Sequence, residues 1–134
     1  AKVILPPTHS VMLAERSMKR VKVGGKTPLS AGLWKAYELL KHEKQTHPDV
    51  NALLIILTDG AGNVAMGNYD PLIESRKIAE KIRDEGFRSI VIDMEQYTFD
   101  QGLAVELAKQ LDAPCYLVAG LKADELIRTV KKEL

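Results

Sequence analysis

The sequence contains almost no cysteine, the residue that forms disulfide bonds and thiolate metal clusters. Its 134 residues include one cysteine, Cys115, so we expect neither a disulfide framework nor a thiolate metal cluster. Cys115 opens a short apolar run, residues 115–118, which favours a buried and chemically inert thiol.

Long hydrophobic runs and an excess of charge of one sign are also missing. No apolar stretch approaches the ~20 residues that a membrane helix needs, and no signal-peptide pattern opens the chain. The formal net charge is +1 and the lysines are spread along the chain, which gives no reason to expect nucleic acid or a membrane surface as partner. We therefore expect a soluble, cytoplasmic protein, while Ala1, which is not an initiator methionine, is compatible with a fragment of a longer chain.

The common catalytic motifs are incomplete or absent. A phosphate-binding loop at 25–27 would need a glycine five residues before Gly25, where the chain has Arg20. His42 and His47 are five residues apart, so on a helix they diverge by about 140° and do not form the zinc-protease pair. No Gly-x-Ser-x-Gly elbow occurs. Nothing in the sequence specifies a catalytic nucleophile.

The most informative stretch that is present is residues 51–60, Asn-Ala-Leu-Leu-Ile-Ile-Leu-Thr-Asp-Gly. The unbroken apolar run at 53–57 predicts a strand buried on both faces, as in the centre of a parallel sheet. The run ends in Thr58-Asp59-Gly60, and ligands of open α/β sheets bind beyond the carboxyl ends of the strands. Taken alone, Asp59 is equally well interpreted as a ligand or as a turn or N-cap residue.

Helical and strand patterns divide the rest of the chain. Strands are predicted at 2–5, 53–57, 88–94 and 115–118, and helices are predicted to begin near Thr8 or Ser10, at Pro28, at Asp70-Pro71, at Asp100 or Gln101, and at Lys122. Gly86 is predicted to end the third helix in a left-handed conformation. The apolar stripes of the first three helices are predicted to be Val11, Ala14, Met18 and Val21, then Leu29, Leu33, Ala36 and Leu40, then Leu72, Ile78, Ala79 and Ile82.

The order of these elements determines the predicted fold. From residue 51 onward, strands and helices alternate, which predicts parallel strands joined by helical crossovers. Because no linker or low-complexity tract interrupts the chain, residues 1–134 are predicted to form one domain. The fold class is α/β, with a doubly wound, mainly parallel sheet and helices on both faces.

Two oxygen-bearing side chains are predicted to meet at one edge of this sheet. Thr27 lies in a glycine-hinged loop that opens a helix, and Asp59 follows the central strand. A hydroxyl, a carboxylate and water are hard ligands that suit magnesium or manganese, although two protein oxygens need a third contributor. Asp93 is near enough in the predicted order to contribute, but a plain strand-end aspartate is its favoured interpretation.

The motifs Gly-Gly-x-Thr-Pro-Leu at 24–29 and Leu-Thr-Asp-Gly at 57–60 resemble the von Willebrand factor A-type domain with its metal-ion-dependent adhesion site (MIDAS). The chain is more closely similar to the A-type domain of the D subunit of magnesium and cobalt chelatases. That likeness includes Leu-Pro-Pro-Thr at 5–8, Asn-Val at 63–64, Val-Ile-Asp-x-Glu at 91–95, Gly-Leu-Ala at 102–104 and the tail at 121–126. It extends in order over essentially the whole chain.

The resemblance implies roles for individual residues. Thr27 corresponds to a direct magnesium ligand and Asp59 to an aspartate that reaches the ion through water, with Gly25, Gly60 and Asp93 as supporting residues of the rim. The Asp-x-Ser-x-Ser loop of the family is absent from the sequence. The match therefore begins at the family's third strand, which implies an amino-terminally truncated domain with an incomplete site. We expect this chain alone to bind Mg²⁺ weakly or not at all.

The resemblance also implies a function. It predicts a non-catalytic, metal-dependent interaction module of an ATP-dependent chelatase that inserts magnesium or cobalt into a tetrapyrrole, with the ATPase and porphyrin-binding subunits as partners. An A-type structural or adhesion module of an unrelated protein is the alternative, and a nucleotide or phosphosugar site at the sheet rim is a third. Because the family's first strand is absent, the edge at 53–57 is predicted to be covered by residues 2–5 or by another copy in a homodimer.

Overall fold

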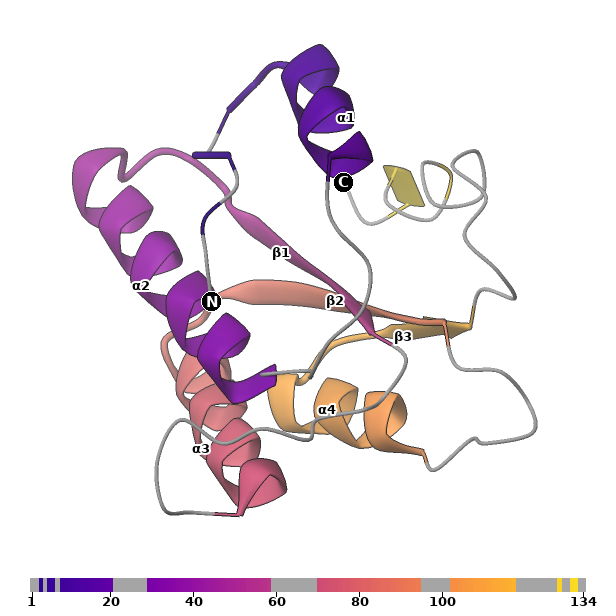
Figure 1. Cartoon of the computed structure of the whole chain (residues 1–134). Helices are drawn as coiled ribbons and strands as arrows, with labels where there is room; N and C mark the ends of the chain where they lie inside the picture. Colours follow the sequence, from indigo (N-terminus) through magenta and orange to yellow (C-terminus); the bar gives the residue numbers. More distant parts are fainter. Residues whose placement is uncertain are drawn as a thin grey trace.

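The computed structural model contains a three-stranded parallel sheet flanked by helices (Figure 1). It describes residues 3, 5–6, 8–20, 29–58, 70–94, 102–117, 128 and 131–132. The elements in chain order are α1 (Val11–Lys19), α2 (Leu29–Thr46), β1 (Leu53–Thr58), α3 (Pro71–Asp84), β2 (Arg88–Asp93), α4 (Leu103–Leu111) and β3 (Cys115–Leu117). The predicted α/β class with a parallel sheet is confirmed.

The strand order is β1-β2-β3, so β2 is the central strand. Leu53 pairs with Arg88 at the start of β1 and Thr58 pairs with Asp93 at its end, in a continuous parallel register. The interpretation of residues 53–57 as a central strand buried on both faces is wrong for the described part of the chain. Ile55 is 38% exposed and Leu57 is 40% exposed, on the sheet face that they share with their register partners Ile90 and Ile92, and β1 has β2 alone as a neighbour among the described strands.

One face of the sheet carries the main core. Helices α2, α3 and α4 all cover this face, which Figure 1 shows below the sheet. The fully or nearly fully buried side chains of this core are Leu33, Tyr37, Leu40, Ile78, Ala79, Ile82, Val91, Ala104, Leu107, Ala108 and Leu111. The predicted stripes of the second and third helices supply much of this list, but Leu72 is 49% exposed and was wrongly included.

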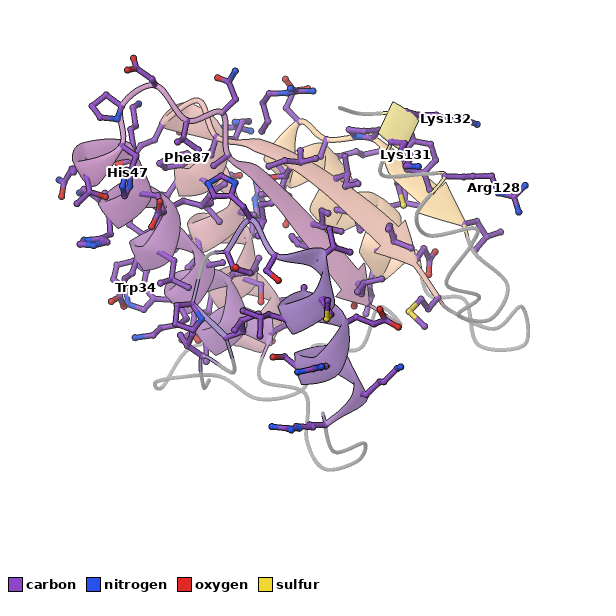
Figure 2. All side chains as sticks on the ribbon, turned by 90° about the horizontal axis from the view of Figure 1, so that it is seen from above. Trp34, His47, Phe87, Arg128, Lys131 and Lys132 are labelled. Atoms are coloured by element: carbon purple, nitrogen blue, oxygen red, sulfur yellow. The ribbon has the colours of Figure 1, made fainter. Side chains whose placement is uncertain are left out.

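The opposite face carries a smaller cluster. Ile90 and Ile92 of β2 are buried there together with the partly buried Leu53 and Met94. Helix α1 lies on this side of the sheet in both views (Figures 1 and 2). Of its predicted apolar stripe, Val11 is 81% exposed and Ala14 is half-buried, while Val21 and the side chain of Met18 lie outside what the structure describes. A nine-residue helix with so little buried surface depends on its cap: the Ser10 hydroxyl accepts the Leu13 N–H at 3.2 Å, as the sequence predicted.

Helix ends follow the predicted capping chemistry in one helix and depart from it in another. Asp70 caps α3, with its carboxylate accepting the Leu72 N–H at 2.9 Å, and Gly86 follows the helix with φ of 81°. Both predictions are confirmed. Helix α4 is instead preceded by Gly102, whose φ of 70° favours glycine, and not by Asp100 or Gln101.

The two ends of the chain depart most from the sequence predictions. Val3 and Leu5 lie outside any strand, so the described residues of the predicted strand at 2–5 do not cover β1. Prolines follow directly in the sequence. Because proline has no backbone N–H, a short segment that ends in prolines can form few of the hydrogen bonds that pair strands. Cys115 is half-buried rather than buried, because β3 has β2 alone as a neighbour among the described strands. Residues 128, 131 and 132 are helical, as predicted, while most of that last helix lies outside the described residues.

Candidate functional site

The carboxyl ends of the strands form one rim of the sheet. Thr58 and Asp93 are register partners at the ends of β1 and β2, and Asp93 in turn pairs with Leu117 at the end of β3. The Met94 N–H donates to the Thr58 carbonyl at 2.8 Å, which continues the ladder by one step. The chain therefore leaves β1 for Asp59 directly beside the point where β2 ends.

Asp93 is the predicted site residue that the structure describes. Its side chain is 3% exposed, and the neighbouring Thr58 is 8% exposed. A buried carboxylate at a strand end is held by contacts within the protein, as this one is. Asp93 therefore suits a supporting role beneath the rim better than that of an open ligand in direct contact with solvent.

Four predicted site residues, Thr27, Asp59, Gly25 and Gly60, lie outside the described residues. Their flanking elements still constrain the topology. Helix α2 begins at Leu29, two positions after Thr27, on the side of the molecule where β1 ends (Figure 1). Helix α2 starts at the rim where β1 ends, and this is the arrangement that the predicted pair of oxygen ligands needs.

The side chains at the described part of the rim carry the type of oxygen atom that Mg²⁺ binds. Thr58 and Asp93 carry hydroxyl and carboxylate oxygen, which is the type of ligand that Mg²⁺ prefers, but both are buried and engaged in contacts within the protein, so they support the rim. Within the described ranges, no group of three or more His, Cys, Asp or Glu side chains is arranged to hold a metal ion. A magnesium site at this rim would accordingly depend on Thr27 and Asp59.

His42 and His47, whose spacing is close to that of a zinc-protease motif, lie near the carboxyl end of α2. Both are exposed, and His47 Nδ1 lies 3.2 Å from Glu43 Oε2 and 3.1 Å from the Thr46 hydroxyl. These contacts join neighbours along one helix end and do not form a shared metal site.

A contact that sequence reasoning missed joins α2 to the end of α3. The Tyr37 hydroxyl donates to Glu85 Oε1 at 2.7 Å, although 48 positions separate the two residues. Tyr37 is absent from the predicted apolar stripe of its helix, but it is 3% exposed and belongs to the core. The helical spacing of Leu33, Tyr37 and Leu40 is the signal that identifies it.

None of the helices in the described part of the chain is both long and apolar enough to cross a membrane. No protein-family model matches the sequence. No solved structure matches it either.

Curated relatives do match over most of the chain. The uncharacterized protein MJ0910 of Methanocaldococcus jannaschii is 33% identical over 132 residues, which are 98% of this chain and 75% of that protein. The uncharacterized protein Rv2850c of Mycobacterium tuberculosis is 39% identical over 131 residues, 98% of this chain and 20% of that protein. The magnesium-chelatase 67 kDa subunit of Heliobacterium mobile is 32% identical over 139 residues, 98% of this chain and 21% of that subunit.

Four further relatives, 29–31% identical, are also named magnesium-chelatase subunits. Homologues over most of this chain are thus chelatase subunits by name. The chain spans about a fifth of the length of these subunits and of Rv2850c, and three quarters of MJ0910.

Proposed function

This chain belongs to the same family as the protein MJ0910 of Methanocaldococcus jannaschii, and we propose that it is a magnesium-dependent protein-interaction module of a magnesium or cobalt chelatase. The proposed chelatase acts in tetrapyrrole biosynthesis, toward chlorophyll or cobalamin, and uses ATP. The support for a chelatase role is the homology over most of the chain to proteins named magnesium-chelatase subunits.

One structural observation carries the proposal of a metal-dependent contact. The register pairs Thr58 with Asp93, so β1 and β2 end side by side, and the chain continues from Thr58 directly into Asp59. In parallel α/β sheets this rim is where ligands bind. The start of α2 on the same side of the molecule supports the placement of Thr27 near this rim.

Each residue of the proposed site has a distinct task. Thr27 contributes a hydroxyl oxygen as a direct ligand, and Asp59 contributes a carboxylate that holds the ion through water. Gly25 and Gly60 let the two loops turn away from the rim. Asp93 supports the rim from below. Bound Mg²⁺ supplies a positive charge at which a partner's carboxylate can complete the coordination.

The proposed module carries out no catalysis by itself. Its task is to link the ATPase and porphyrin-binding subunits of the assembly. The alternative, an A-type module of an unrelated adhesion or structural protein, is less well supported, since named chelatase subunits match 84–98% of this chain.

Association with the chelatase ATPase subunit is expected to require magnesium. In biolayer interferometry, the immobilised chain should bind the purified ATPase subunit in millimolar Mg²⁺, and chelation of the ion by EDTA should weaken binding at least tenfold, because the ion joins the two surfaces. Equal binding in Mg²⁺ and in EDTA would refute a metal-dependent contact. Binding to neither chelatase subunit would refute the chelatase assignment itself.

Among the residues that the structure describes, no strand pairs with the outer edge of β1, and this edge supports a second contact, between two copies of this chain. Natural edge strands are guarded by charged residues or proline, but residues 51–58 contain neither. An apolar cleft of about 580 Å³ adjoins this edge between α2 and the start of β1, with Leu39, Leu40, Val50 and Leu53 among its lining residues. If two copies paired their β1 strands about a two-fold axis, no like charges would face each other, because β1 contains no charged residue.

We propose that β1 pairs with β1 of a second copy in antiparallel orientation. The substitution Leu57→Lys places a charge on this half-exposed edge and should convert the dimer to a monomer in light scattering coupled to size exclusion. Ile73→Lys is the matched control, because Ile73 is exposed on α3 and should leave the dimer intact. A wild-type chain that is monomeric at high micromolar concentration would exclude this dimer.

A further inference from the structure

A cluster of aromatic and lysine side chains lies where α2 and α3 pack together. We call Trp34, Tyr37, Lys41 and Lys81 the α2–α3 patch. The rings of Trp34 and Tyr37 lie with centroids 5.4 Å apart and planes inclined by 35°. Figure 2 shows Trp34 on the outer side of its helix. Trp34 is 37% exposed, so part of a large apolar ring faces solvent.

The patch is held in place from below. Tyr37 is buried, and its hydroxyl donates to Glu85 at 2.7 Å, which fixes the ring that Trp34 leans against. A tryptophan that rests on a fixed tyrosine loses little conformational freedom when it binds a partner. Pre-ordered aromatic side chains of this kind are typical of the energetically dominant residues of protein interfaces.

Lysine ammonium groups surround the two rings. Lys81 Nζ is 5.2 Å from the Tyr37 ring centroid and 5.9 Å from that of Trp34. Lys41 Nζ is 5.7 Å from the Tyr37 centroid and donates a hydrogen bond to the Tyr37 hydroxyl at 3.5 Å, so it lies beside the hydroxyl and not over the ring face. A little further along α2, Lys44 Nζ lies 5.5 Å from the ring centroid of Phe87. The distances for Lys81 and Lys44 are those of cation–π contacts.

The carboxylates on these helices do not neutralise the lysines. Glu80 pairs with Arg76, Asp84 pairs with Arg83, and Glu43 pairs with His47. Within the described residues, none of Lys41, Lys44 and Lys81 has a carboxylate oxygen within 4 Å. Glu38 adjoins the patch, so the local balance is three lysines against one carboxylate, besides Glu85 beneath Tyr37.

The surface is shallowly hollowed at this point. A depression of about 560 Å³ is lined by all four residues of the patch and by Lys35 and Gln45, among others. Its chemistry combines an exposed indole with ammonium groups that outnumber the carboxylates around them. A complementary ligand must therefore offer carboxylates together with an apolar group.

We propose that the α2–α3 patch binds an acidic peptide segment of a partner protein, with an apolar side chain against Trp34 and carboxylates at Lys41 and Lys81. A nucleic acid fits less well, because Tyr37 is buried and Lys81 already lies against the ring of Trp34, the exposed aromatic side chain of the patch on which a base would stack. This contact uses no metal and does not depend on the proposed chelatase function.

Trp34 is the single tryptophan of the sequence, so its fluorescence reports on the patch directly. The probe is a synthetic peptide of Glu-Glu-Leu-Pro repeats, titrated into the whole chain in EDTA so that the proposed magnesium site contributes nothing. We expect a saturable change in Trp34 emission that weakens as ionic strength rises. A Gln-Gln-Leu-Pro peptide of the same length should bind at least tenfold more weakly.

Variants distinguish the patch from general attraction between charges. The double substitution Lys41→Gln and Lys81→Gln should raise the dissociation constant for the acidic peptide about tenfold. Lys109→Gln, on the exposed side of α4, removes a charge elsewhere and should leave it unchanged. Thermal unfolding of each variant verifies that the fold is retained.

Three results would each overturn the proposal: no saturable change in Trp34 emission, equal binding by the double variant and the wild type, or tighter binding by oligodeoxythymidine than by the acidic peptide. The last result would assign the patch to nucleic acid. Because the titration is done in EDTA, a failure of the magnesium site leaves its outcome unaffected, and the two proposals fail independently.

Discussion

The substitution Ile82→Ala is expected to lower the free energy of unfolding by about 3 kcal/mol, within the range of about 2–5 kcal/mol found for such truncations. Ile82 is 0% exposed and belongs to the core that α2, α3 and α4 form on one face of the sheet. Removal of three carbon atoms there costs transfer free energy and leaves a cavity. Urea denaturation followed by circular dichroism measures the loss.

Ile73→Ala is the matched control for this measurement. Ile73 lies on the same helix and is 53% exposed, so the same chemical change should cost less than about 1 kcal/mol. Both substitutions change helix propensity equally, and the difference between them isolates burial. If both substitutions lowered the free energy of unfolding equally, the face of α3 that carries Ile82 would not be the face that packs on the sheet.

The substitution Asp59→Asn is expected to abolish most of the magnesium dependence of partner binding. It keeps the size of the side chain but removes the negative charge that holds the ion through water. Groups that orient metal-bound ligands contribute about 10–100-fold to metal affinity, so association with the ATPase subunit in Mg²⁺ should fall to the level that the wild type shows in EDTA. Thr27→Ala should have a similar effect through loss of a direct ligand.

Asp49→Asn is the control for charge. Asp49 lies in the turn between α2 and β1, at the amino-terminal end of the strand and thus at the end of the sheet opposite the proposed site. It is exposed, and its neutralisation should leave magnesium-dependent binding unchanged. If Asp49→Asn and Asp59→Asn weakened binding equally, the effect would come from net charge and not from a metal site.

The parts of the fold that depend on local chemistry were predictable from the sequence. Asp70-Pro71 and Gly86 mark the two ends of α3, because a carboxylate caps free N–H groups and glycine tolerates positive φ. The apolar run of β2 and the helical spacing of Leu107, Ala108 and Leu111 on α4 predicted elements that the structure contains. Alternation of these elements was enough to predict the parallel sheet.

Features that depend on neighbours distant in the sequence were not predictable in the same way. The run at 53–57 is as apolar as a central strand, yet β1 is flanked by β2 alone among the described residues. Val11 recurs at helical spacing but is exposed, because periodicity does not state which surface, if any, will cover a helix. Lys81 approaches Trp34 and Tyr37 through the packing of α3 against α2, which no sequence spacing encodes.

For the site itself, the sequence predicted the rim and the structure supports its topology. Thr58 and Asp93 end neighbouring strands in register, which is the arrangement needed if Asp59 is to lie at a ligand-binding edge. The assignment of Thr27 and Asp59 as magnesium ligands remains a prediction. It came from a resemblance in motifs, since two oxygen donors far apart in sequence do not by themselves define a metal site.

A magnesium titration of the isotope-labelled chain, followed by the backbone amide resonances in NMR spectra, tests the central claim most directly. We expect shifts confined to residues 25–29 and 58–61, with a dissociation constant of about 1 mM or weaker, in keeping with a site of few protein ligands. The same titration of the Asp59→Asn variant should leave these resonances in place. Shifts at other residues in place of these, tight binding by the wild type, or equal shifts in the variant would contradict a weak magnesium site built on Thr27 and Asp59.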